Sequence, residues 1–145
     1  MDPDCKIMDD FCIWVENILR WVDRTGTPTI PWIGQAGGRV LNPPAPHLEF
    51  IYTLEGTWED ILVGERKARF VQGLVSLHNV HQGNSGPPPE GGRGRAWCCF
   101  FDVKGVAEFA ALEKAPLFCS APVTDGTRLA AAFAELQKRC LTLLG

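Results

Sequence analysis

The sequence predicts a mainly β domain, either a sandwich or a barrel, with helices at both ends. Between residues 29 and 103, short runs of β-forming residues alternate with glycine and proline turns, as in sandwiches and barrels. Residues 4–23 and 125–144 instead repeat apolar residues every three or four positions, which is the period of a helix. A length of 145 residues favours one domain, 1–145.

The composition excludes several classes of protein. Hydrophobic residues make up 46% and charged residues 21%, which is an ordinary globular balance and excludes general disorder. The net charge of -3 lacks the basic footprint of an autonomous nucleic-acid-binding domain. No apolar run is long enough for a membrane span, and the acidic start does not resemble a secretory signal. The six cysteines form no C-x-x-C pair, so we expect reduced core thiols and a cytoplasmic location.

The strands are bounded by turn residues. The best strand is 47–54. The glycine- and proline-rich segment 83–95 is expected to be a mobile loop or a long hairpin tip, because it offers few side chains to pack. A short helix is expected within 105–114 and an extended segment at 115–124. The other predicted strands are 29–33, 39–41, 58–63, 66–71, 74–80 and 96–103.

Strand 47–54 separates two kinds of side chain. Leu48, Phe50 and Tyr52 share the face that should pack on another layer, whereas Glu49 and Ile51 share the opposite face. That second face either lines a small cavity, with Glu49 as a hydrogen-bond acceptor, or lies open to water. Tryptophans in separate strands, among them Trp58, are either ligand-stacking surfaces or simply core.

The histidines allow a second interpretation. His78 and His81 form H-N-V-H, and with Glu49 they could make a two-histidine, one-carboxylate metal set. Each histidine alone is more typical of a hydrogen-bonded turn or pocket residue. No serine or cysteine nucleophile motif and no phosphate-binding loop is present in the sequence.

The order of several motifs resembles a known family. Glu49-Phe-Ile-Tyr-Thr-Leu-Glu-Gly56, then Gly64-Glu-Arg, then Gln72-Gly73-Leu-Val-Ser-Leu and His81 resemble the cupin half-motifs. They are most similar to the N-terminal effector-binding domain of AraC-type transcriptional regulators. The aromatic strand from Ala96 and the C-terminal segment around Phe133 fit the same order. The H-x-H of metal cupins does not precede Glu49, and the family's helix-turn-helix region is not in this sequence.

The resemblance implies a cupin-like double-stranded β-barrel, or jelly roll, that binds a small-molecule effector without chemistry and without a cofactor. A sugar is one candidate effector. The alternatives are a small metal-dependent cupin enzyme of the isomerase or dioxygenase type, and a structural domain with a dry barrel. If a metal were bound, its ligands would be Glu49, His78 and His81. The residues that the resemblance and the strand pattern together assign to the ligand are Arg39, Glu49, Ile51, Trp58, His81 and Cys98.

The resemblance also implies a homodimer, with no direct contact to nucleic acid or membrane. The C-terminal helix carries one apolar stripe, which could pack on a second copy or on the chain's own sheet. The family's antiparallel helix pair favours the dimer. The expected dimer residues are Leu129, Phe133, Leu136, Cys140 and Leu143.

Overall fold

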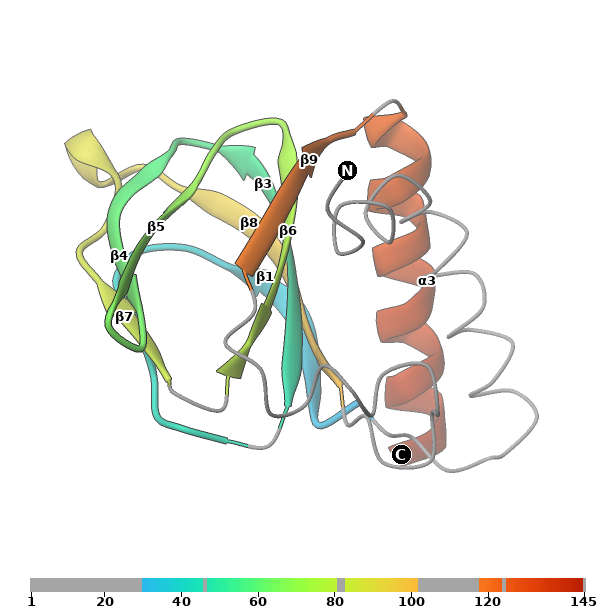
Figure 1. Cartoon of the computed structure of the whole chain (residues 1–145). Helices are drawn as coiled ribbons and strands as arrows, with labels where there is room; N and C mark the ends of the chain where they lie inside the picture. The colour runs from blue at the N-terminus through green and yellow to red at the C-terminus, as the bar shows by residue number, and fades with distance from the viewer. Residues whose placement is uncertain (1–29, 46, 81–82, 102–117, 124, 145) are drawn as a thin grey trace.

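A computed structural model describes residues 30–45, 47–80, 83–101, 118–123 and 125–144. Within them, antiparallel strands form two sheets and the chain ends in a helix (Figure 1), which confirms the mainly β class and the C-terminal helix. The predicted helices at 4–23 and 105–114 lie outside the described residues. The elements are β1 (Trp32–Ala36), β2 (Val40–Asn42), β3 (Leu48–Glu55), β4 (Trp58–Val63), β5 (Arg66–Phe70), β6 (Leu74–Asn79), β7 (Asn84–Gly86), the 3-10 turn η2 (Glu90–Gly92), β8 (Arg95–Phe101), β9 (Phe118–Pro122) and α3 (Gly126–Leu144).

The two sheets stay separate. One has five strands in the order β1-β8-β3-β6-β9, and the other has four in the order β2-β7-β4-β5. A buried cluster joins Ile51 and Cys98 of the first sheet to Trp58, Ile61 and Phe70 of the second, so the sheets pack face to face. Because each sheet keeps two edge strands, the β-barrel predicted for 29–103 is not closed, and the body is an open sandwich, which is the other architecture that the turn pattern predicts.

Strand β3 contributes to both sides of its sheet. Leu48, Phe50 and Tyr52 belong to the cluster that packs under α3, whereas Ile51 belongs to the cluster between the sheets. Glu49 shares the face of Ile51 and is only 2% exposed. The alternation predicted from the sequence is therefore present. Of the two alternatives for the Glu49 face, the one in which Glu49 lies open to water is wrong.

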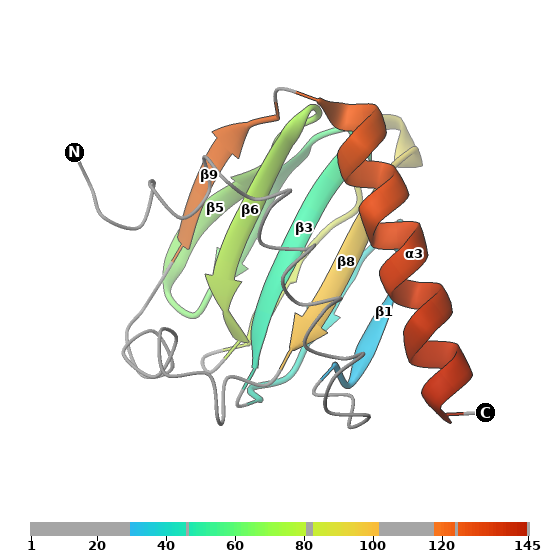
Figure 2. The ribbon, with the colours of Figure 1, turned by 90° about the vertical axis from the view of Figure 1, so that its right-hand side faces the viewer.

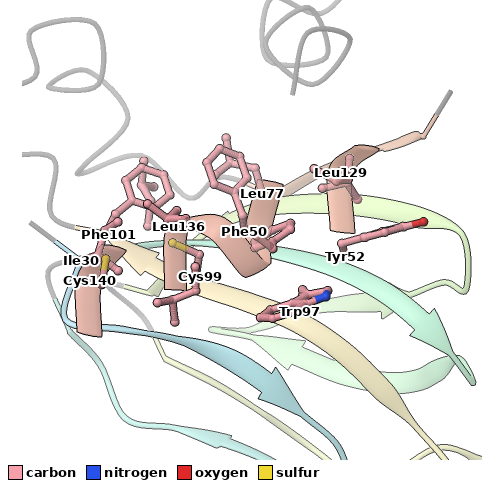
Figure 3. Packing of buried hydrophobic residues seen from close by; sticks show 14 residues of the cluster. Ile30, Phe50, Tyr52, Leu77, Trp97, Cys99, Phe101, Leu129, Leu136 and Cys140 are labelled. Atoms are coloured by element: carbon pink, nitrogen blue, oxygen red, sulfur yellow. The ribbon is translucent and has the colours of Figure 1, made fainter. Parts of the chain in front are cut away.

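Helix α3 lies along the outer face of the five-stranded sheet, over β8 and β1 (Figure 2). Asp125 caps its first turn, since Oδ1 accepts a hydrogen bond of 3.0 Å from the Arg128 amide. The Trp97 ring of β8 stacks on Phe133 at 5.8 Å between centroids. Figure 3 shows side chains of the helix and of the sheet pointing toward each other, with Leu129, Leu136 and Cys140 on the helix side.

This packing corrects the expected dimer surface. Leu129, Phe133, Leu136 and Cys140 are all buried in the chain's own core, and Leu136 is 1% exposed. A side chain already enclosed in one copy has no surface to offer a second copy. The side chain of Leu143 lies outside the description. Homodimerisation stays a prediction, but these four residues do not form its interface.

Segment 83–95 is only partly the loop that its composition predicts: Asn84–Gly86 form a strand, whereas residues 87–94 contain only the 3-10 turn and are mostly exposed. Strand β7 lies between β2 and β4 in the second sheet, and Asn84 is buried. A Cβ added to Gly86 would approach the Asp60 carbonyl oxygen of β4 to 2.7 Å, so the close approach of that backbone favours glycine there. A Cβ on Gly94 would likewise approach the Trp58 ring to 2.6 Å. In the described part of the chain, no helix is long and apolar enough to cross a membrane.

Candidate functional site

A cavity of about 350 Å³ opens between the two sheets at the β1 and β2 side of the sandwich. Its inner wall is made of buried residues, whereas exposed and half-buried residues form its rim. The inner residues are Glu49, Ile51, Trp58, Phe70, Ala96 and Cys98; the others are Trp32, Ala36, Gly37, Gly38, Arg39, Val40, Leu41, Asn42 and Phe100.

The inner wall is largely apolar. Trp58, Phe70 and Ile51 supply two aromatic rings and a branched aliphatic side chain. The indole N–H of Trp58 donates a hydrogen bond of 2.8 Å to the Gly38 carbonyl. Because its only polar group is thereby paired with the backbone, Trp58 acts toward the cavity as an apolar surface.

Glu49 is the one charged side chain in the inner wall. Its Oε1 lies 2.8 Å from His78 Nε2 and 3.3 Å from Asn84 Nδ2, which donates to it. Asn84 Nδ2 also lies 2.6 Å from His78 Nε2. A ring nitrogen either donates or accepts, so His78 Nε2 serves one of these two contacts at a time. We call Glu49, His78 and Asn84, with Asn42, the polar cluster.

The polar cluster connects the sheets. Glu49 and His78 are register partners on β3 and β6, and Asn84 reaches them from β7 of the other sheet. Asn42 Nδ2 donates to Asn84 Oδ1 at 2.5 Å from the neighbouring strand. The Phe70 ring stacks against the His78 ring at 5.7 Å and 15°. These contacts fix the Glu49 carboxylate between two layers.

Cys98 lies on β8, opposite Ile51 of β3. Burial, followed by the nearby charge of Glu49, holds the pKa of the Cys98 thiol well above its usual range. Near neutral pH the group is therefore a thiol, and a thiol is a poor nucleophile. Cys98 fits a wall residue better than a catalytic one.

Five of the six residues predicted to bind a ligand line this one cavity: Glu49, Ile51, Trp58 and Cys98 on the inner wall, and Arg39 at the rim. The sixth, His81, lies outside the described residues. The alternative metal ligands would be Glu49, His78 and His81. Glu49 and His78 are in contact, whereas His81 lies outside the described residues. The described residues contain no group of three or more histidine, cysteine or acidic side chains placed to hold a metal ion.

Sequence reasoning missed two important residues. Phe70 lines the cavity, and its signal was present, because Ala68 and Phe70 alternate with exposed residues along β5. Asn84 gave no usable signal, since it stands within a glycine- and proline-rich segment that predicts a loop.

The comparisons with known proteins identify no relative. No family model, no curated protein and no solved structure matches this chain. The likeness to AraC-type effector domains therefore rests on the motifs in the sequence.

Proposed function

We propose that this chain is a ligand-binding domain whose cavity takes a small-molecule effector, in the manner of the sensing half of an AraC-type regulator. The cavity carries this proposal. A volume of about 350 Å³ falls in the range of small-molecule sites, which are mostly apolar with a few fixed polar groups. One buried carboxylate set among aromatic and aliphatic side chains matches that description.

Binding without chemistry is the simplest use of these residues. The Cys98 thiol is not activated, and His78 and Asn84 hold the Glu49 carboxylate in place through Oε1. An effector that prefers one arrangement of the cavity shifts the population toward that arrangement. In a full regulator, further domains would respond to that shift. A cupin-like jelly roll, as a finer description of the sandwich, belongs to the same proposal.

A thermal-shift screen over sugars and aromatic acids tests the proposal. A ligand that binds only the folded chain raises the apparent melting temperature in a concentration-dependent way. Ala36 is exposed at the rim, so Ala36→Trp should block entry while leaving the fold intact. Ala134→Trp, at an exposed position of α3, is the matched control. Failure of every compound, or equal shifts in both variants, would refute a ligand site in this cavity.

The contact between Glu49 and His78 is the observation that favours the metal-enzyme alternative. Elemental analysis of the purified chain separates the two functions. We expect no stoichiometric zinc, iron, manganese or nickel, because the H-x-H before Glu49 is missing and Asn84 already contacts both residues. One tightly held metal per chain, lost in Glu49→Gln, would favour the enzyme.

A further inference from the structure

We propose that the cavity selects a small aromatic compound whose inner end donates a hydrogen bond, with Glu49 as the selecting group and Asn84 as its positioning residue. This inference rests on the function proposed above and specifies its ligand class. It depends on which polar atoms the inner wall offers and on how Glu49 is held.

The inner wall offers few polar groups. Trp58 has its N–H paired with Gly38, and the thiol of Cys98 forms only weak hydrogen bonds. A sugar carries hydroxyls around its whole ring, and each one buried without a partner costs free energy. The rings of Trp58 and Phe70 instead suit a flat apolar body. The scarcity of polar groups and the two aromatic rings in the inner wall therefore favour an aromatic ligand over a sugar.

Glu49 determines which polar end of the ligand can point inward. In its charged form a carboxylate only accepts hydrogen bonds, so it pairs with a hydroxyl or an amino group and repels another carboxylate or a carbonyl. Arg39 is exposed at the rim, where an anionic end of the ligand would lie. The two charges thus favour a compound with a donor at its inner end and an acid at its outer end.

Asn84 keeps the acceptor in place. Its amide donates to Glu49 Oε1 and is itself held through Oδ1 by Asn42. Because Asn84 belongs to the other sheet, it resists rotation of the carboxylate toward a different partner. It does not line the cavity, so any effect of Asn84 on selectivity must act through Glu49.

Calorimetric titration with two isosteric probes tests the proposal. The probes are para-hydroxyphenylpropanoate and para-methylphenylpropanoate, which differ in the inner donor alone, with glucose as the sugar. We expect the hydroxyl probe to bind roughly tenfold or more tightly than the methyl probe, because a site built around a hydroxyl rejects analogues that lack it. Glucose should give no measurable heat of binding.

The variants separate the roles of the residues. Glu49→Gln should reduce the ratio of the two affinities at least severalfold, and Asn84→Ala should reduce it in the same direction. Arg39→Gln should weaken both acids equally and leave the ratio unchanged. Glu65→Gln, an exposed residue in the β4–β5 turn, removes the same charge outside the cavity and should change nothing.

The possible failures differ from one another. Equal affinity for the two aromatic probes, or an unchanged ratio in Glu49→Gln, would overturn the selection by Glu49. An unchanged ratio in Asn84→Ala would remove its positioning role. Binding of glucose, or of other compounds in the thermal-shift screen but of neither aromatic probe, would overturn the ligand class while leaving an effector site in place. Absence of any binder in that screen would instead refute the proposed function.

Discussion

Glu49 of β3 and Asn84 of β7 meet across the interior of the sandwich, where the Asn84 amide donates a hydrogen bond of 3.3 Å to the Glu49 carboxylate. Both side chains are almost fully buried, and they belong to different sheets. A buried charge is tolerated only when polar partners surround it. The contact therefore helps to hold the two sheets together, and it also fixes the position of the Glu49 carboxylate in the cavity wall.

Asn84→Ala should lower the free energy of unfolding by about 1–3 kcal/mol, because it removes a donor from a buried acceptor. Urea denaturation followed by circular dichroism measures this change. Ser85→Ala is the control, since Ser85 is a half-buried neighbour on the same strand and should change stability far less. Similar losses in both variants would mean that the strand, rather than the amide, is responsible.

Leu136→Glu should unfold the chain rather than dissociate a dimer. Leu136 is enclosed between α3 and the sheet, so the substitution leaves an unpaired charge in the core, at a cost of about 3–5 kcal/mol. Ala131→Glu places the same group at an exposed helix position and should fold normally. Circular dichroism and sedimentation would test both. A folded Leu136→Glu monomer beside a wild-type dimer would restore the helix-pair interface.

Thr53→Val should stabilise the chain by about 1 kcal/mol. Thr53 is fully buried, and its Oγ1 has no hydrogen-bond partner among the described residues. Valine keeps the shape and removes the desolvated hydroxyl. At Thr57, by contrast, the hydroxyl accepts a 3.1 Å bond from the Gln72 amide, so Thr57→Val should give no such gain. Calorimetric melting of both variants checks the contrast, and a lower melting temperature for Thr53→Val would contradict it.

Stability should fall at alkaline pH because of the buried thiols. Burial raises the pKa of Cys98 and Cys99 in the folded chain, whereas the unfolded chain releases these protons near its ordinary pKa of about 8.5. The folded state then holds more protons than the unfolded state, so their contribution is complete below that pH and declines above it. Cys99→Ala should flatten the decline in urea titrations from neutral to alkaline pH. An unchanged slope would assign it to other groups.

The strands could be predicted where local patterns govern them. Trp58–Val63 has the predicted bounds, and the alternation along Leu48–Glu55 correctly placed Glu49 and Ile51 on one face. Strand Asn84–Gly86 could not be predicted, because its glycine is explained by the close approach of the β4 backbone at Asp60 and Ile61, which no local pattern reveals. The helix stripe had two possible partners, and periodicity alone does not reveal which surface covers it.

The candidate site was predictable to a similar degree. Strand alternation and the family likeness led to five side chains that line one cavity. The support for Glu49 was not predictable, because Asn84 comes from a distant strand and its contact depends on how the two sheets are stacked. A contact between residues so far apart in the sequence produces no periodic pattern from which a single sequence could predict it.

Strands β3 and β8 expose alternate side chains to two different environments. Ile51 and Cys98 face the cavity, while their chain neighbours Phe50 and Trp97 pack beneath α3. The cavity-facing and the helix-facing side chains of each strand share one peptide backbone. Densely packed cores transmit displacements instead of absorbing them. A displacement of the cavity wall therefore acts directly on the side chains packed beneath α3, because only one sheet separates the cavity from the helix.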